Sequence, residues 1–218
     1  DGDVSNSLHT DQFKEKYPDR FLQMYIAEQN MVGVATGLAR QGLKPFITTF
    51  ACFLTRAHDQ IRLLPLLGVT VYFNGSYAGV SLGRDGPSQM GLEDIAMFRA
   101  IQGSTVLYPS DPYQTERLVE EMLKHPPVGG GVVYIRTTRE PTPVIYGPDE
   151  AFPIAGSKVF EPSNPASPAG RQATNNQLTT LISAGITVHE SLNAQKQLAS
   201  EGIAVRVIDC YSVKPIDT

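Results

Sequence analysis

One glutamate stands where a carboxyl group could take part in proton transfer. Glu28 follows the apolar segment 25–27 and opens a stretch with helical spacing. An acid in the first turn of a helix often only complements the positive end of the helix dipole. An apolar setting would instead bury the carboxyl, raise its pKa and let it share a proton near neutral pH. The sequence leaves both interpretations of Glu28 open.

Two other segments could contribute to a ligand site. Phe50 and Phe53 lie three residues apart at the expected end of a strand. This spacing is typical of a packed core, and it would also suit a clamp for a flat heteroaromatic ring. The glycine-rich stretch 75–86 has no helical period and indicates a functional loop, with Asp85 near its end and Gln89 just beyond it. Its glycines match neither common phosphate-binding pattern, so their spacing alone predicts no phosphate cradle.

Charged and metal-ligating residues narrow the possible functions. Arg136 and Arg139 follow an expected strand, and either could bind an anion or form a structural ion pair. The histidines and the two cysteines are scattered, which predicts neither a metal cluster nor a disulfide. With 18 basic and 22 acidic residues the net charge is −4, so no basic surplus favours nucleic-acid binding.

Composition indicates a globular chain with no membrane segment. Hydrophobic residues make up 41% of the chain and charged residues 18%. The most apolar stretch, 63–73, is shorter than the ~20 residues of a membrane span and contains Pro65 and Gly68. The chain opens on Asp1 without a starting methionine or a signal segment, which indicates a cut inside a longer protein.

Short β-rich runs alternate with longer helical patterns over the first part of the chain. The expected strands are 22–26, 45–50, 68–73, 105–108 and 132–136, and the expected helices are 28–40, 51–64, 92–100 and 111–124. This alternation predicts an α/β fold with a doubly wound, largely parallel sheet. Ligands of such sheets gather at the carboxyl ends of the strands, where the candidate residues fall.

The composition changes after residue 140, where prolines concentrate. We expect a first domain over 1–145, a proline-rich extended linker over 146–176 and an incomplete second α/β domain over 177–218. The second domain is expected to hold one βαβ unit, with strands at 178–183 and 204–210 around a helix at 187–200. A lone βαβ unit would leave a sheet edge uncovered.

The order of several motifs resembles that of the transketolase family. The motifs are GDVSNS at 2–7, IAEQNM at 26–31, TFACFLTRAHDQIR at 49–62, DGPSQM at 85–90, YPSD at 108–111 and IRTTR at 135–139. The resemblance covers nearly the whole chain. It is closest to the animal-type branch, because Gln89 stands where other branches usually carry a histidine. The resemblance implies the thiamine-diphosphate-binding fold, with a pyrimidine-binding domain over 1–145 and the start of the C-terminal domain over 177–218.

The resemblance also implies roles around the cofactor thiamine diphosphate. Glu28 would be the catalytic glutamate that holds the ring nitrogen of the aminopyrimidine, which is acid–base work done through the cofactor. Phe53 would pack on the pyrimidine, with Phe50 beside it, and Gln89 would line the pocket. The implied reaction is transfer of a two-carbon ketol unit from a ketose phosphate to an aldose phosphate, as in the pentose phosphate pathway.

By the same resemblance, a second group of residues would bind the sugar phosphate. Asp85 would form a hydrogen bond with a substrate hydroxyl, and Ser7 and Arg139 would hold the phosphate. Tyr77 departs from the family, which usually presents a substrate-binding histidine at this position. A phenol can form hydrogen bonds but carries no positive charge, so the resemblance does not determine the affinity or preference for substrate.

Other parts of the implied site lie outside this chain. Mg²⁺ or Ca²⁺ and the diphosphate would be bound by a domain upstream of Gly2, contributed by another subunit. We therefore expect a cytoplasmic homodimer, or a complex with a separate diphosphate-binding domain, and no ketol transfer by the chain alone. The alternatives are dihydroxyacetone synthase or deoxyxylulose-phosphate synthase, which are sister enzymes, and a non-catalytic transketolase-like fragment that only dimerises.

Overall fold

The computed structural model describes residues 1–162 and 178–217. The chain divides into two compact units. Unit 1 comprises Asp1–Leu107 and Met122–Pro141, and unit 2 comprises Tyr108–Glu121 and Thr142–Thr218. Helix α6 (Pro112–Lys124) contributes residues to both. Among the described residues, no helix is long and apolar enough to cross a membrane.

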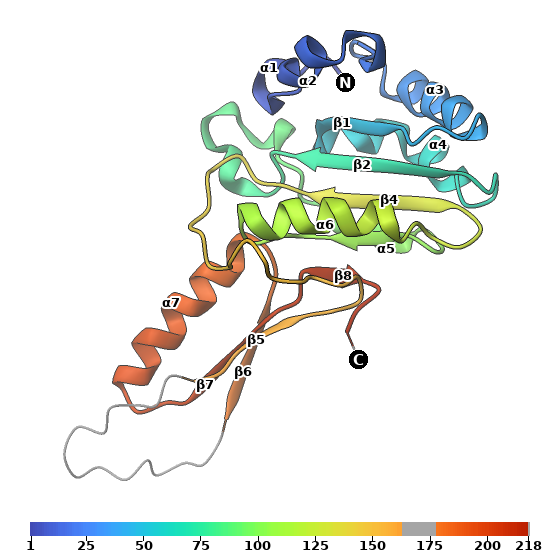
Figure 1. Cartoon of the computed structure of the whole chain (residues 1–218). Helices are drawn as coiled ribbons and strands as arrows, with labels where there is room; N and C mark the ends of the chain where they lie inside the picture. Colours follow the sequence, from blue (N-terminus) through green and yellow to red (C-terminus); the bar gives the residue numbers. More distant parts are fainter. Residues whose placement is uncertain (163–177, 218) are drawn as a thin grey trace. The chain divides into compact units, whose positions relative to one another are not determined.

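Unit 1 is built on parallel strands that lie side by side in Figure 1. In their order across the sheet they are β1 (Phe46–Phe50), β2 (Thr70–Ser76), β4 (Gly131–Arg136) and β3 (Thr105–Leu107). Every residue of β4 is buried, as expected for a central parallel strand covered on both faces. Phe50 pairs with Ser76 and Gly75 with Arg136, so the carboxyl ends of three strands meet at one edge.

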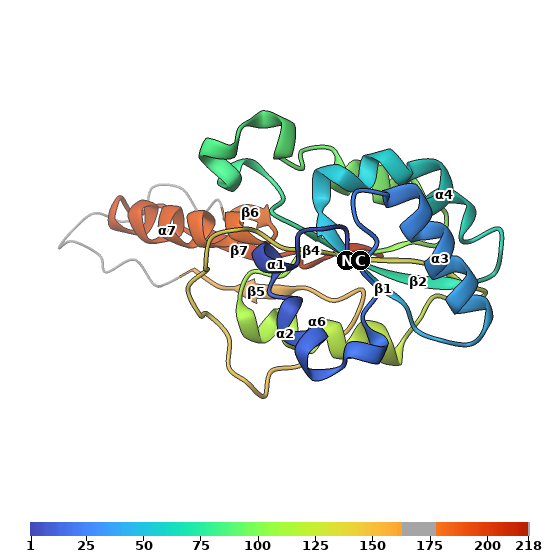
Figure 2. The ribbon, with the colours of Figure 1, turned by 90° about the horizontal axis from the view of Figure 1, so that it is seen from above.

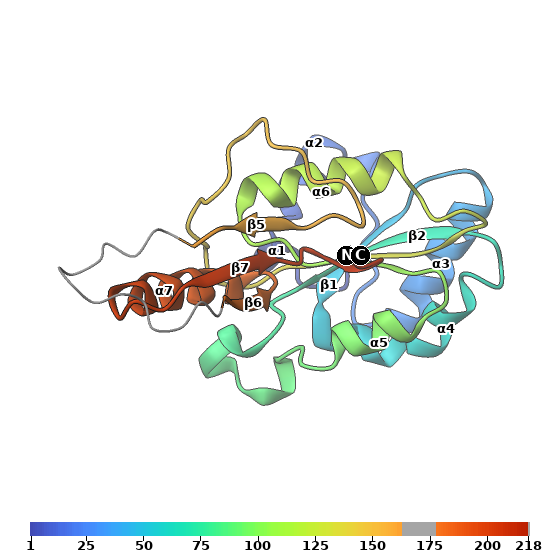
Figure 3. The same ribbon diagram turned by 90° about the horizontal axis from the view of Figure 1, so that it is seen from below.

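Helices cover one face of this sheet. They are α3 (Glu28–Arg40), α4 (His58–Leu63) and α5 (Asp94–Ala100), all on the same side in Figure 3. Figure 2 shows α3 and α4 next to each other, and α3 also contacts β1 and β2. The buried face of α3 consists of Glu28, Met31, Val32 and Ala35. The spacing that predicted the helix was that of Met31, Val34, Ala35 and Leu38, of which Met31 and Ala35 are buried and the other two half-buried. The predicted bounds of the helix are confirmed.

The segment before α3 differs from the prediction. No strand forms at 22–26, because Tyr25 has a φ of 53° and Tyr25 and Ile26 are 67% and 69% exposed. A left-handed residue interrupts extended backbone, and this apolar run does not enter the core. Short helices that the sequence did not predict precede it. They are α1 (Ser5–Leu8), α2 (Asp11–Lys16) and η1 (Pro18–Arg20).

The helix predicted over 51–64 is two elements. The first is a 3₁₀ helix, η2 (Ala51–Ala57), and the second is α4. Within η2 the Thr55 hydroxyl donates to the Cys52 carbonyl over 2.7 Å, an i to i−3 contact that accompanies the tighter winding. The glycine-rich loop predicted after β2 carries two short 3₁₀ turns, η3 (Val80–Asp85) and η4 (Pro87–Gln89).

The described residues of unit 2 contain the predicted βαβ arrangement and two additional strands. Strand β6 (Thr179–Ser183), helix α7 (Ile186–Ser200) and strand β7 (Val205–Asp209) follow in order, and β6 and β7 are parallel. Strand β5 (Lys158–Phe160) pairs antiparallel with the other side of β7. A further short strand, β8 (Ser212–Lys214), lies near the end of the chain.

The position of β5 bears on the predicted linker. An extended linker was expected over 146–176, yet β5 lies inside this range and Tyr146 and Phe152 are buried. These residues pack in unit 2, and the bounds of the linker stay a prediction. The remainder of the predicted linker lies outside the described residues. Strand β5 pairs with one side of β7, and β6 is an edge strand in the order β5-β7-β6.

Candidate active site

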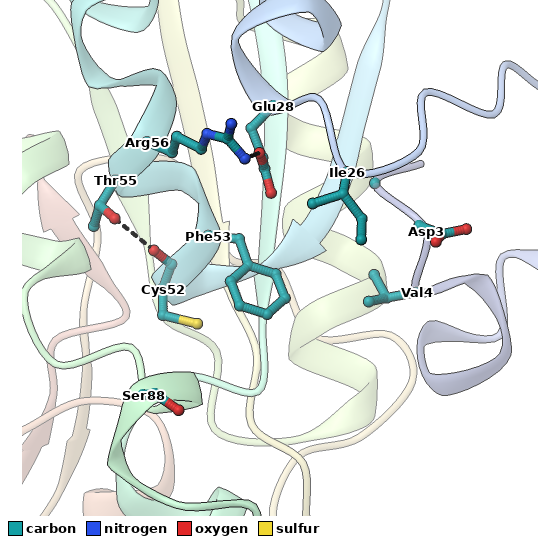
Figure 4. Close-up of a pocket in the computed structure, with 10 residues that line it drawn as sticks. Asp3, Val4, Ile26, Glu28, Cys52, Phe53, Thr55, Arg56 and Ser88 are labelled. Atoms are coloured by element: carbon teal, nitrogen blue, oxygen red, sulfur yellow. Dashed lines mark hydrogen bonds and ion pairs between the residues drawn. The ribbon is translucent and has the colours of Figure 1, made fainter.

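A pocket of about 460 Å³ opens beside the first turn of α3 in unit 1 (Figure 4). Its lining comes from the start of the chain, the α3 entry, η2 and the glycine-rich loop. The lining residues are Gly2, Asp3, Val4, Ile26, Glu28, Cys52, Phe53, Thr55, Arg56 and Ser88. Four segments that are distant in sequence therefore build one site at the strand ends.

Glu28 is both the first residue of α3 and a buried carboxylate. The residue is 4% exposed, and its Oε2 lies 3.4 Å from Nη1 of Arg56. Among the described residues, Oε1 has no hydrogen-bond partner. Figure 4 shows one carboxylate oxygen against Arg56 and the other directed toward the side where Phe53 lies. Glu28 therefore stands at a helix start, where a negative group is favoured, and is also buried. Its role in proton transfer stays a prediction.

Phe53 and Phe50 have different positions relative to the pocket. Phe53 lines the pocket, whereas Phe50 is 6% exposed and is not among the lining residues. Their ring centroids are 5.3 Å apart in a stacked arrangement. Phe50 therefore packs behind Phe53 as a core residue, and the predicted role of Phe53 against a flat ring stays a prediction.

Cys52 and Arg56 line the pocket but were not predicted from the sequence. Burial is the main cause that raises the pKa of the Cys52 thiol to about 11, so this thiol stays protonated at neutral pH and is no nucleophile. Arg56 comes three residues after Phe53. A basic residue at this spacing from an aromatic candidate could have indicated that both side chains line the same pocket. Asp3 and Val4 belong to the GDVSNS motif at 2–7, but no role was predicted for them, because their distance from Glu28 in sequence hides their proximity in the fold.

Gln89 is not among the residues that line this pocket. It lies at the end of η4, is half-buried, and its backbone N–H donates to the Gly86 carbonyl over 3.2 Å. Its neighbour Ser88 is a lining residue instead. The role predicted for Gln89 stays a prediction.

The four predicted substrate residues form a second cluster in unit 1. The Tyr77 hydroxyl donates to the Ser7 carbonyl over 3.1 Å. The Arg139 guanidinium lies 5.6 Å from the centroid of the Tyr77 ring, and its Nη1 donates to Asp85 over 3.0 Å. The structure thus brings Ser7, Tyr77, Asp85 and Arg139 into one connected group, while their roles stay predictions.

Arg136 and Arg139 have different settings. Arg136 is 8% exposed, and its Nε donates to the buried Asp94 over 2.8 Å. The Tyr134 hydroxyl donates to the same carboxylate oxygen over 2.5 Å. Arg136 therefore belongs to a structural ion pair. Arg139, whose side chain is 29% exposed, is the arginine that can reach a ligand.

A parallel α/β sheet with a buried carboxylate and an aromatic wall at its strand ends defines a ligand-binding α/β domain. The family model "Transketolase, pyrimidine binding domain" matches residues 1–144, and "Transketolase, C-terminal domain" matches residues 170–218. The chain belongs to the transketolase family. The resemblance seen in the motifs is thereby confirmed.

Relatives with curated descriptions match the whole chain. Transketolase-like protein 1 of Bos taurus is 47% identical and transketolase of Homo sapiens is 44% identical, each over 100% of this chain. The match covers 34% of the first protein and 33% of the second. This chain therefore spans about a third of the length of these relatives.

Solved structures support the same fold. One, described as "Split gene transketolase, inactive beta4 tetramer", is 34% identical with a TM-score of 0.81, covering 100% of this chain and 65% of that chain. Transketolase from Campylobacter jejuni is 20% identical with a TM-score of 0.74, covering 88% of this chain and 28% of that chain. At this lower identity the likeness concerns the fold.

Proposed function

We propose that this chain is the pyrimidine-binding part of a transketolase. In this role it holds the ring end of thiamine diphosphate and contributes to transfer of a two-carbon ketol unit from a ketose phosphate to an aldose phosphate. The observation that carries the proposal is the buried Glu28 carboxylate, whose Oε1 is without a hydrogen-bond partner among the described residues and faces the Phe53 side of the pocket.

The pocket suits the pyrimidine end of this cofactor. Val4, Ile26 and Phe53 offer apolar surface for a flat ring, and Glu28 offers an acceptor for a ring N–H. Thiamine diphosphate, when bound, supplies a thiazolium carbon that becomes reactive on losing its proton. Glu28 holds or moves the proton at the pyrimidine nitrogen, and Arg56 keeps the carboxylate charge compensated.

The diphosphate end of thiamine diphosphate requires ligands that the residues lining the pocket do not supply. Among the described residues, no cluster of three or more His, Cys, Asp or Glu side chains could hold a metal ion. We infer that Mg²⁺ or Ca²⁺ and the diphosphate bind to a domain in another segment or subunit, in a homodimer or in a two-chain assembly. The split-gene relative is described as an inactive tetramer, which supports the need for such a partner. We place this assembly in the cytoplasm.

Reconstitution tests the proposal. The chain is mixed with the diphosphate-binding part of a related transketolase, and thiamine diphosphate binding and ketol transfer are measured for the mixture and for each part. We expect transfer by the mixture alone and weak cofactor binding by the isolated chain, since the diphosphate contributes much of the affinity. Strong turnover by the isolated chain would contradict the need for a partner. A mixture that assembles yet binds no cofactor would contradict the proposed function.

A further inference from the structure

The 3₁₀ winding of η2 determines which of its side chains face the pocket. A 3₁₀ helix has three residues per turn, so side chains three positions apart lie in line on one face. Phe53 and Arg56 have this spacing within η2, and both line the pocket. In an α-helix the same two side chains would point about 60° away from each other. The local winding therefore presents an aromatic ring and a cation to the same space.

Other residues of η2 hold this winding in place. Leu54 and Ala57 are fully buried, and the Thr55 hydroxyl donates to the Cys52 carbonyl over 2.7 Å. The side chain of Arg56, in contrast, is 60% exposed. Arg56 is therefore fixed at its backbone by a packed turn, while its guanidinium reaches the pocket from the solvent side.

Arg56 is the ion-pair partner of Glu28 in the described part of the chain. The Glu28 side chain is only 5% exposed, and a buried charge is costly unless an opposite charge lies nearby. The 3.4 Å between Nη1 of Arg56 and Oε2 of Glu28 exceeds the ~2.7–2.9 Å of a short charge-assisted hydrogen bond. Attraction between the charges therefore contributes more to this pair than a directed hydrogen bond does.

The pair gives the Glu28 carboxylate a direction. One oxygen faces Arg56, and the other points toward the side where Phe53 lies (Figure 4). Among the described residues, this second oxygen has no hydrogen-bond partner. Without Arg56, the structure offers the carboxylate no charged group that distinguishes one orientation from another.

We propose that Arg56 is a positioning residue that draws one oxygen of Glu28 to itself and so directs the other at a bound aminopyrimidine ring. Arg56 acts through Glu28 and needs no contact of its own with the ring. The inference rests on the proposed function for the identity of the ring. It goes beyond compensation of charge, because it predicts that loss of Arg56 impairs proton transfer more than cofactor binding. The apolar surface of Val4, Ile26 and Phe53 remains available to the ring in either case.

A first experiment uses the full chain without cofactor. The side-chain carboxyl carbon of Glu28 is observed by NMR in a chain that carries isotope-labelled glutamate. We expect its resonance to move in Arg56→Gln and to stay near the parent position in Arg56→Lys, which keeps the positive charge. Arg62→Gln is the matched control and should leave the resonance unchanged. Arg62 is 54% exposed and lies 2.6 Å from the Asp59 carboxylate, so it is also an exposed, ion-paired arginine.

A second experiment uses the chain reconstituted with a diphosphate-binding part. Proton exchange at the thiazolium carbon and the Kd of thiamine diphosphate are measured for the same variants. We expect Arg56→Gln to slow exchange by about tenfold and to change the Kd by less than about threefold, since a partly exposed charge contributes less than the acid–base group itself. Arg56→Lys should recover exchange to within about threefold of the parent rate. In a Glu28→Gln background, removal of Arg56 should have no further effect.

Three results would overturn the proposal. They are an unmoved Glu28 resonance in Arg56→Gln, an undiminished effect of Arg56→Gln on exchange in the Glu28→Gln background, and an equal loss of exchange in Arg62→Gln. Should Arg56→Gln not fold, the Nε–H resonance of Arg56 in Glu28→Gln reports the same contact, and an unmoved resonance there also overturns the proposal. A parent assembly that binds no cofactor would contradict the proposed function and leave the resonances measured without cofactor in place.

Discussion

At the scale of single residues, the proposed chemistry of the pocket depends on Glu28. The variant Glu28→Gln preserves the size of the side chain but replaces the carboxyl group by an amide, which cannot take up and release a proton. Removing a positioned acid–base group typically slows a proton transfer by about 10²–10⁴-fold. We therefore expect proton exchange at the thiazolium carbon of the reconstituted enzyme to slow by this order.

The matched control is Gln29→Asn, since Gln29 is the next residue of α3 and is exposed. It should leave the exchange rate unchanged. Proton exchange that proceeds at the normal rate in Glu28→Gln would refute the assigned role of the carboxylate.

Sequence reasoning found the residues whose type carries chemistry. Glu28 and Phe53 were predicted from local patterns, and both line the pocket. Asp3, Cys52 and Ser88 also line it and lie within the quoted motifs, but no role was predicted for them, because their place in the pocket results from the meeting of distant segments. The choice between Arg136 and Arg139 needed the structure, since only the fold shows that Asp94 is buried against one of them.

At the scale of elements, the base of the glycine-rich loop is held by a close backbone contact. Gly91 forms an isolated bridge with Ala78, and its carbonyl accepts from the Gly79 N–H over 2.8 Å. A Cβ at Gly91 would lie 2.6 Å from the Cβ of Ala51 in η2. We expect Gly91→Ala to lower the free energy of unfolding by about 1–3 kcal/mol and to displace Ser88 from the pocket.

Gly33 of α3 is the control, because nothing lies within 4 Å of a Cβ added there. Gly33→Ala should raise the free energy of unfolding by about 0.5–1 kcal/mol through helix propensity. Urea denaturation of both variants measures the difference. Equal stability of Gly91→Ala and the parent chain would show that η2 and the loop are not tightly packed.

The end of β7 is held by a buried carboxylate in unit 2. Oδ2 of Asp209 accepts hydrogen bonds from the side chains of Ser110, Gln114 and Tyr146 over 3.0, 2.9 and 2.7 Å. Burial is the main cause that raises the pKa of Asp209. The folded chain therefore holds this proton more tightly than the unfolded chain, whose aspartates titrate near pH ~3.9.

The sign of the pH effect follows from this difference. The contribution of Asp209 to stability is most favourable below the unfolded-state pKa and falls as the pH rises toward the folded-state value. Asp209→Asn keeps an acceptor and removes the buried charge, so we expect a flatter dependence of stability on pH between about 4 and 7. Urea denaturation across this range measures it, with the exposed Asp149→Asn as control. If the free energy of unfolding changes with pH equally in the parent chain, in Asp209→Asn and in Asp149→Asn, the pH dependence does not come from Asp209.

Helix α3 and the strands of unit 1 could be predicted because periodicity decides their buried faces. The strand expected at 22–26 failed because an apolar run need not be buried, and Tyr25 turns the backbone outward. Strand β5 was not predicted because its pairing with β7 is non-local and its three residues carry no pattern of their own.

At the scale of the whole molecule, the net charge and the length of the chain are consistent with the proposed function. A net charge of −4 is compatible with sugar-phosphate recognition, since one partly exposed arginine can bind a phosphate without a basic surface. The chain spans about a third of its transketolase relatives, and the proposed function gives its pocket only one end of the cofactor. The proposed function accordingly assigns the catalytic cycle to an assembly.

Strand β5 has a practical consequence for expression of shorter versions of this protein. It pairs with the side of β7 opposite β6, and β7 carries the buried residues Val205 and Val207. A protein trimmed to begin after β5 would expose the backbone N–H and C=O groups of an apolar edge strand, which favours self-association. A soluble C-terminal fragment should therefore start upstream of Lys158.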